Sequence, residues 1–144
     1  HALLFDDYGH HPVELHTTIE AARLAYPNRR LVLVFQPHRY TRTRDLFEDF
    51  IKELKTADLL ILTEVYAAGE KRIDNADSRA LARSLRLQNM DSKLIYEADL
   101  TKLAPLVLEQ AREGDLILTM GAGNISRVPS ELLALAKEKQ RALS

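Results

Sequence analysis

Short apolar runs alternate with longer amphipathic segments along the whole chain. Residues 31–35 form an unbroken apolar run rich in β-branched side chains, which predicts a strand buried on both faces of a sheet. Phe47, Phe50 and Leu54 instead recur at helical spacing and predict the inner face of a helix. This alternation is typical of an α/β fold with a Rossmann-like open, mostly parallel sheet and helices on both faces.

The same pattern predicts where the individual elements lie. Strands are expected at residues 2–6, 31–35, 58–63, 93–96 and 115–120. Helices are expected at residues 12–26, at about 47–54, from a cap at Asp77 or Ser78 to about 87, at 103–111, and from 130 onward. In the first and last helices, the side chains expected to face the core are those of Leu15, Ile19, Ala22, Leu24, Leu132, Leu133, Leu135 and Ala136. With no repeat or linker, residues 1–144 are expected to form a single domain.

Four loops should meet at one edge of such a sheet. Ligands of open α/β sheets bind outside the carboxyl ends of the strands, where the loops lead into helices. Here those loops are residues 6–12, 36–43, 64–75 and 121–126. Three of the four are richer in charged or aromatic residues than a connecting turn requires, so we expect the functional site among them.

Composition narrows the class of protein. The chain has 144 residues, 46% hydrophobic and 28% charged, which is the balance of a globular domain and excludes disordered and fibrous classes. Its formal net charge of -1 gives no electrostatic reason to expect nucleic acid or an anionic membrane as a partner. Without Cys, disulfides and thiolate metal sites are excluded, and a reducing, cytoplasmic location is expected. No apolar run approaches the ~20 residues that a membrane-spanning helix needs.

The densest group of reactive side chains follows the first predicted strand. Residues 6–12 read Asp-Asp-Tyr-Gly-His-His-Pro, so two carboxylates, a phenol and two imidazoles stand together. They offer hydrogen-bond acceptors, a ring for stacking and groups that titrate near neutral pH. The alternative is a structural turn in which Asp6 and Asp7 cap the next helix. Because adjacent histidines seldom point the same way, we expect this chain to hold no metal ion.

The second loop carries a pair of arginines. Arg39 and Arg42 are close enough in sequence to bind one anion together, and their guanidinium groups match a carboxylate or phosphate in bidentate geometry. Thr41 or Thr43 is expected to cap the following helix, whose N-terminus would add positive charge at the same place. The alternative is a solvated basic turn paired with nearby carboxylates.

The fourth loop begins with two glycines. Gly121 and Gly123 permit a tight turn that exposes backbone N–H groups, as in many anion-binding cradles. The segment lacks the Lys and Ser/Thr of a phosphate-binding P-loop, and it is not the three-glycine dinucleotide fingerprint. Neither of those motifs therefore accounts for the function.

Together these motifs resemble the C-terminal domain of the Mur ligases. The resemblance rests on residues 6–12 with Glu14, on 35–43, on 65–70, on 76–78 and on 121–125, in the expected order over nearly the whole chain. Within the family, Tyr8-Gly9 in place of Phe-Ala favours the members that add L-alanine to UDP-N-acetylmuramate over those that recycle murein tripeptide. One departure is Arg127-Val128-Pro129, where the family pattern would run directly into a helix.

The resemblance implies an activity for a longer protein. Mur ligases use ATP to convert a carboxylate into an acyl phosphate, which an amine then attacks, in the synthesis of peptidoglycan. They have three domains, and the first two hold the UDP-sugar, the phosphate-binding loop and most Mg2+ ligands. Because the chain begins at His1 with a strand-like run, we expect it to be a fragment, a lid that binds nucleotide and amino acid and is inactive alone.

The resemblance also implies roles for individual residues. Asp7 and Asp6 would hydrogen-bond the nucleotide ribose or order its loop, and Tyr8 would lie against the adenine. His10, Arg39 and Arg42 would face the amino acid or the phosphoryl group, where cations bind the alanine carboxylate or developing charge.

Two other classes of protein remain as alternatives. One is a non-catalytic nucleotide-binding module with an unknown partner. The other is a phospho-receiver, which needs an acceptor Asp at the end of its third strand, where this chain has Thr63 and Glu64.

Overall fold

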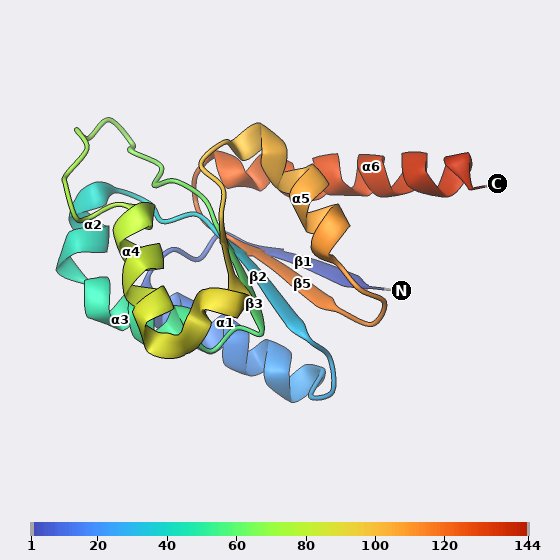
Figure 1. The fold of residues 1–144 in the computed structure, drawn as a ribbon, viewed down its shortest axis with the longest axis horizontal. Helices are drawn as coiled ribbons and strands as arrows, with labels where there is room; N and C mark the ends of the chain where they lie inside the picture. Colours follow the sequence, from blue (N-terminus) through green and yellow to red (C-terminus); the bar gives the residue numbers. More distant parts are fainter. Residues whose placement is uncertain (1, 144) are drawn as a thin grey trace.

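The computed structural model, which describes residues 2–143, contains a five-stranded sheet in the order β1-β5-β2-β3-β4. All of its strand pairs are parallel (Figure 1). The strands are β1 (Leu3–Asp7), β2 (Leu31–Phe35), β3 (Leu59–Leu62), β4 (Leu94–Tyr96) and β5 (Leu116–Met120). The expected fold class is confirmed.

Strand register brings the carboxyl ends of the strands to one level. Met120, the last residue of β5, is paired with Asp7 of β1 on one side and with Phe35 of β2 on the other. Phe35 is in turn paired with Leu62 of β3, which is paired with Tyr96 of β4. The loops that follow all five strands therefore leave the sheet along the same edge.

Side chains along β2 alternate between two cores. Leu31, Leu33 and Phe35 join the cluster that α1 (Pro12–Ala25), α3 (Phe47–Leu54) and α4 (Ser78–Leu85) cover. Val32 and Val34 join the cluster on the opposite face, under α5 (Leu103–Gln110) and α6 (Val128–Ala142). Figure 1 shows these two helical layers, with α6 running on past the sheet. No helix within residues 2–143 is both long and apolar enough to cross a membrane.

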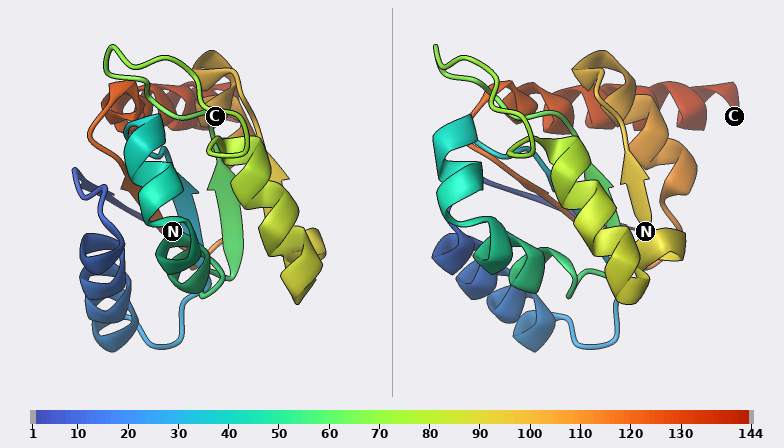
Figure 2. Two further views of the ribbon diagram at one scale, coloured as in Figure 1. Left: turned by 90° about the vertical axis from the view of Figure 1, so that its left-hand side faces the viewer. Right: turned by 60° about the vertical axis from the view of Figure 1, so that its left-hand side comes forward.

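The second loop is shorter than the sequence predicts. Residues 40–43 were expected in the loop, but α2 (Tyr40–Asp45) already begins at Tyr40. No side chain of its own segment caps its first turn, so the usual local signal is missing. The loop between β3 and α4, residues 63–77, lies beside α2 and contacts its first turn (Figure 2).

The other predictions that the structure contradicts concern where helices begin and end and which of their side chains are buried. The last helix begins at Val128, with Pro129 in its first turn, and not at residue 130, because Pro is well tolerated there. The fourth helix ends at Leu85, and the chain then turns at Gln88 and Asn89, whose φ and ψ angles are not helical. Leu24, Leu133 and Ala136, expected in the core, are exposed, since these long helices bury only a narrow stripe of side chains and α6 outruns the sheet.

Candidate functional site

Three aromatic rings form a row across the loops at the carboxyl edge of the sheet. The rings of His10, after β1, and His38, after β2, have centroids 5.3 Å apart. The ring of Tyr66, after β3, stacks on His38 at 5.4 Å. Residues from three separate loops therefore meet at this edge, as the sequence predicted.

The two aspartates of the first loop make different contacts. Thr119 donates its hydroxyl hydrogen to Asp6 Oδ1 at 2.7 Å, while the Asp6 side chain remains exposed. Asp7 Oδ1 accepts from the backbone N–H of Gly9 at 2.6 Å, and Asp7 Oδ2 accepts from Thr18 at 3.4 Å. Asp7 therefore orders the turn, whereas Asp6 lies on the surface. Neither caps α1.

His11 supplies that cap. Its Nδ1 accepts from Val13 N at 3.1 Å, and Glu14 returns the contact by accepting from His11 N at 3.0 Å. His10 Nδ1 lies 3.2 Å from the carbonyl oxygen of Tyr8, which accepts only, so this nitrogen carries the hydrogen. Tyr8 is 69% exposed and open to a stacking partner.

Arg42 fixes the protonation state of His38. Its Nη1 donates to the His38 carbonyl oxygen at 2.9 Å and lies 3.1 Å from His38 Nδ1. A guanidinium only donates, so Nδ1 must be the unprotonated nitrogen and the ring hydrogen lies on Nε2. Burial lowers the pKa of His38, and the nearby His10, Arg42 and Arg39 lower it further. His38 is therefore a neutral ring held against the Arg42 guanidinium.

Arg39 combines an unusual backbone conformation with a guanidinium group that is available to bind a ligand. Its φ is 72° and its ψ is 137°, a region that non-glycine residues rarely adopt and that costs about 1–3 kcal/mol. The side chain is exposed, and within residues 2–143 its guanidinium makes no hydrogen bond or ion pair. Strained backbone of this kind is concentrated at functional sites.

Glu70, in the loop after β3, occupies the N-terminus of α2. Its carboxylate accepts from Thr41 N at 3.1 Å and from Thr41 Oγ1 at 2.5 Å. These hydrogen bonds, the side-chain bond first, lower the pKa of Glu70. The prediction that Thr41 or Thr43 caps α2 is wrong, because Thr43 Oγ1 donates to the Arg39 carbonyl and Thr41 donates to Glu70.

The glycine loop is held by a residue that is not among the predicted site residues. Gln36, only 5% exposed, donates from Nε2 to Asn124 at 2.8 Å and accepts from Ile125 N at 3.1 Å. Gly123 packs directly on the Tyr66 ring, since a Cβ there would lie 2.5 Å from Tyr66 Cγ. Gln36 and Tyr66 belong to the segments that carry the family resemblance, which was the feature of the sequence that could have marked them as site residues.

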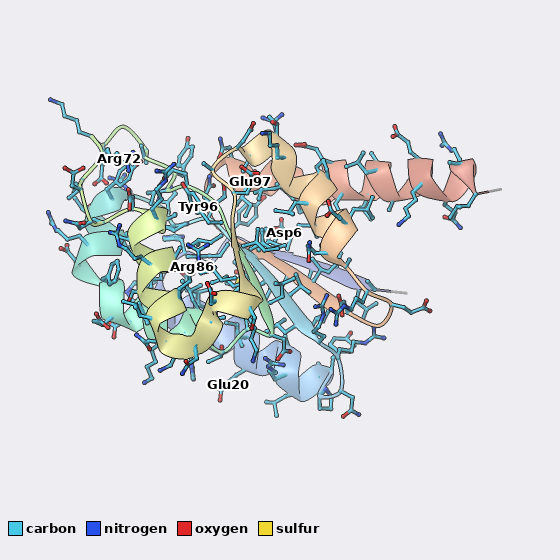
Figure 3. All side chains as sticks on the ribbon, viewed as in Figure 1. Asp6, Glu20, Arg72, Arg86, Tyr96 and Glu97 are labelled. Carbon is cyan, nitrogen blue, oxygen red and sulfur yellow. The ribbon has the colours of Figure 1, made fainter. Side chains whose placement is uncertain are left out.

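A second polar cluster lies farther along the edge, at β4. Glu64 accepts from the Tyr96 hydroxyl at 2.9 Å, and Arg72 is hydrogen-bonded to Asp77, the cap of α4. Figure 3 shows Arg72 out in the loop before α4, with Tyr96 and Glu97 at the end of β4. These side chains already pair with one another and leave the row of rings as the more open site.

The arrangement is suited to binding an anion. It offers the unoccupied guanidinium of Arg39, the guanidinium of Arg42, a neutral imidazole and the exposed phenol of Tyr8. In residues 2–143, no three His, Asp or Glu side chains are grouped so that they could hold a metal ion. The chemistry that these residues provide is electrostatic binding and orientation of a ligand.

Comparison with known proteins gives the family. The chain is 60% identical over 137 residues to UDP-N-acetylmuramate–L-alanine ligase of Neisseria meningitidis serogroup A, covering 95% of the chain and 29% of the relative. The structure resembles UDP-N-acetylmuramate-alanine ligase from Thermotoga maritima with a TM-score of 0.74 and 25% identity, over 96% of this chain and 27% of that one. A murein peptide ligase from Psychrobacter arcticus, 18% identical, shares the fold with a TM-score of 0.68, over 92% of this chain and 27% of that one.

The family model confirms the resemblance found in the motifs. It describes the glutamate ligase domain of Mur ligases and matches residues 1–123. All the loops of the candidate site lie within that match, apart from the end of the glycine loop. With a match over most of its length, the chain belongs to the Mur ligase family, as a glutamate ligase domain.

Proposed function

We propose that this chain is the closing domain of a three-domain, ATP-dependent ligase that joins L-alanine to UDP-N-acetylmuramate in peptidoglycan synthesis in the cytoplasm. The 60% identical relative carries the name of that ligase, and the chain spans only 29% of its length. The likeness to a murein peptide ligase, at 18% identity, supports the fold alone. The alanine-adding activity is therefore the better supported of the two.

The proposed reaction has two steps. A carboxylate oxygen of UDP-N-acetylmuramate attacks the γ-phosphorus of ATP, the bond to the bridging oxygen of ADP breaks, and an acyl phosphate forms. The alanine nitrogen then attacks the acyl carbon, the carbon–oxygen bond to phosphate breaks, and the amine loses a proton. Bringing the amine and the acyl phosphate together is the task of a closing domain, because correct placement supplies much of the rate.

Arg39 carries the proposal for the amino-acid end. An unoccupied guanidinium on a strained backbone, within the row of loops, is a binding group held ready for an anion. The neutral His38 precedes it on the same loop, and Arg42, in the first turn of α2, contacts His38. We assign the alanine carboxylate to Arg39 and Arg42, with His10 at the adjoining reaction end.

The first loop would meet the nucleotide. The ring of Tyr8 is exposed enough to stack on adenine, and Asp6 Oδ2 is available to the ribose hydroxyls. Asp7, whose two oxygens accept from Gly9 and Thr18, keeps this loop in shape. The nucleotide is thus assigned to Tyr8 and Asp6, with Asp7 in support.

Mg2+ is assigned to the remainder of the ligase. Bound with ATP, it would neutralise phosphate charge. The described residues offer no set of three ligands for it, so no step above depends on a metal ion held by this chain. UDP-N-acetylmuramate is likewise assigned mainly to the rest of the ligase.

The test uses the full-length ligase and this chain alone. Arg39→Ala should raise the KM for L-alanine about 30-fold or more, since a hydrogen-bonded charge contributes ~2 kcal/mol or more, and leave the KM for ATP within about twofold. The chain alone should bind ATP weakly and form no product. Product formation by the chain alone, or an unchanged KM for L-alanine in Arg39→Ala, contradicts the proposal.

A further inference from the structure

The first turn of α2 depends on a residue from another loop. α2 lacks a side-chain cap from its own segment. Glu70, 29 positions farther along the chain, accepts from the Thr41 N–H and from the Thr41 hydroxyl instead. These two contacts join the loop after β3 to the start of α2.

Arg39 lies at the junction that these contacts hold. Its strained backbone persists only if the surroundings fix it. Arg39 N donates to the Tyr66 carbonyl at 2.8 Å, and Thr43 N and Oγ1 donate to the Arg39 carbonyl at 3.2 and 2.9 Å. Glu70 completes the set by anchoring the residue two positions after Arg39. The contacts with Tyr66 and Glu70 both come from the loop after β3.

We infer that Glu70 is a positioning residue for the amino-acid carboxylate, an inference that rests on the proposed function. By holding the first turn of α2, it fixes the backbone of Arg39 and, one turn on, the direction of Arg42. The two guanidinium groups are thereby presented to one anion. Glu70 itself does not touch the substrate in this assignment.

A competing account treats Glu70 simply as a negative charge close to the anion site. Its charge does act on Arg39. On that account, removing the charge would strengthen anion binding, because the repulsion of the carboxylate would disappear. On the positioning account, removing the contacts weakens binding. The two accounts therefore predict opposite signs.

The decisive variants are Glu70→Ala and Glu70→Gln in the full-length ligase. Glu70→Ala removes both the contacts and the charge, and should raise the KM for L-alanine about tenfold with kcat and the KM for ATP within about twofold, because binding geometry alone is lost. Glu70→Gln removes only the charge. Its amide can still accept from Thr41 N and pair with the hydroxyl, so most of the affinity should return.

Thr41→Val is the second route to the same perturbation. It removes the hydroxyl contact from the other side and should raise the KM for L-alanine in the same direction. Combined with Glu70→Ala it should add little, since both changes break one interaction. If Glu70→Ala folds poorly, the KM for L-alanine in Thr41→Val decides between the two accounts.

Asp99→Ala is the matched control. Asp99 also accepts from the N–H and the hydroxyl of one threonine, Thr101, at 2.9 and 2.6 Å, but it does so after β4, away from Arg39. It should leave the KM for L-alanine unchanged. An equal rise in Asp99→Ala and Glu70→Ala would show a general stability effect and overturn the inference.

The outcomes separate this inference from the proposed function. A lower or unchanged KM for L-alanine in Glu70→Ala, with a raised KM in Arg39→Ala, overturns the role of Glu70 alone. Unchanged KM values in both variants overturn the assignment of the alanine carboxylate itself.

Discussion

Gly123 is the position at which one methyl group should disturb the row of rings. Its φ of -94° is open to alanine, so a substitution there is opposed by contacts and not by backbone strain. A Cβ would lie 2.5 Å from Tyr66 Cγ and 2.7 Å from Gln36 Oε1. The Tyr66 ring must therefore move in Gly123→Ala, and with it the stacking on His38.

The size of the effect follows from two opposing contributions. Overpacking a filled site costs about 1–3 kcal/mol. Replacing glycine with alanine restricts the unfolded chain, which stabilises the folded state by about 0.4–1 kcal/mol. We therefore expect Gly123→Ala to lower the free energy of unfolding by about 1–2 kcal/mol. In the ligase, displacing His38 should also raise the KM for L-alanine.

Denaturant unfolding of this chain and steady-state kinetics of the ligase measure the two effects. The control is Tyr66→Ala, which removes the ring atom that Cβ would strike first but leaves Tyr66 Cβ and Gln36 Oε1, each 2.7 Å from it, so Gly123→Ala should cost less, though not nothing, in that background. If Gly123→Ala is as stable as the wild type and leaves the KM for L-alanine unchanged, the packing argument is refuted. The same holds if the cost is undiminished without the Tyr66 ring.

Three further predictions concern stability, pH and the nucleotide. Asp115→Ala should lower the free energy of unfolding, measured in urea, by about 3–5 kcal/mol, because it leaves the Arg30 guanidinium, 2.8 Å away, without its buried partner. A decrease below about 1 kcal/mol would contradict this. Burial raises the pKa of Asp115, but hydrogen bonds from Arg30 and Arg112 outweigh it and lower the pKa overall, so this stabilisation should be present above pH ~4 and be lost as pH falls through the lowered value. Because the pKa of His38 is lowered in the folded chain, the unfolded chain takes up a proton at His38 first as pH falls. The free energy of unfolding should therefore decrease below pH ~6.5, and His38→Gln should reduce this pH dependence. Tyr8→Ala should raise the KM for ATP about tenfold, a stacking loss of ~1–3 kcal/mol, while Tyr8→Phe stays near wild type.

The apolar pattern determined most of the fold. The continuous runs that became β2 and β5 are buried at every position, because helices cover both faces of the sheet. Since the strands are parallel, their carboxyl ends share one edge, and this alone brought His10 and Arg39 into one candidate site. The exposed Leu24 and Leu133 show the limit of the pattern, because helical spacing alone does not tell how wide a stripe the sheet covers.

Contacts between loops were decided by the tertiary structure. That Glu70 caps α2, that Gln36 holds the glycine loop, and that Arg39 has a positive φ all depend on which strands are neighbours and in what register. β5, last in the sequence, lies between β1 and β2, and so carries Gly123 to the Tyr66 ring. The sequence by itself determined where the buried strands lie and which loops carry the candidate site residues, because a buried strand is a local apolar run. Only the tertiary structure determined how those loops hold one another, because such contacts join residues far apart in the chain.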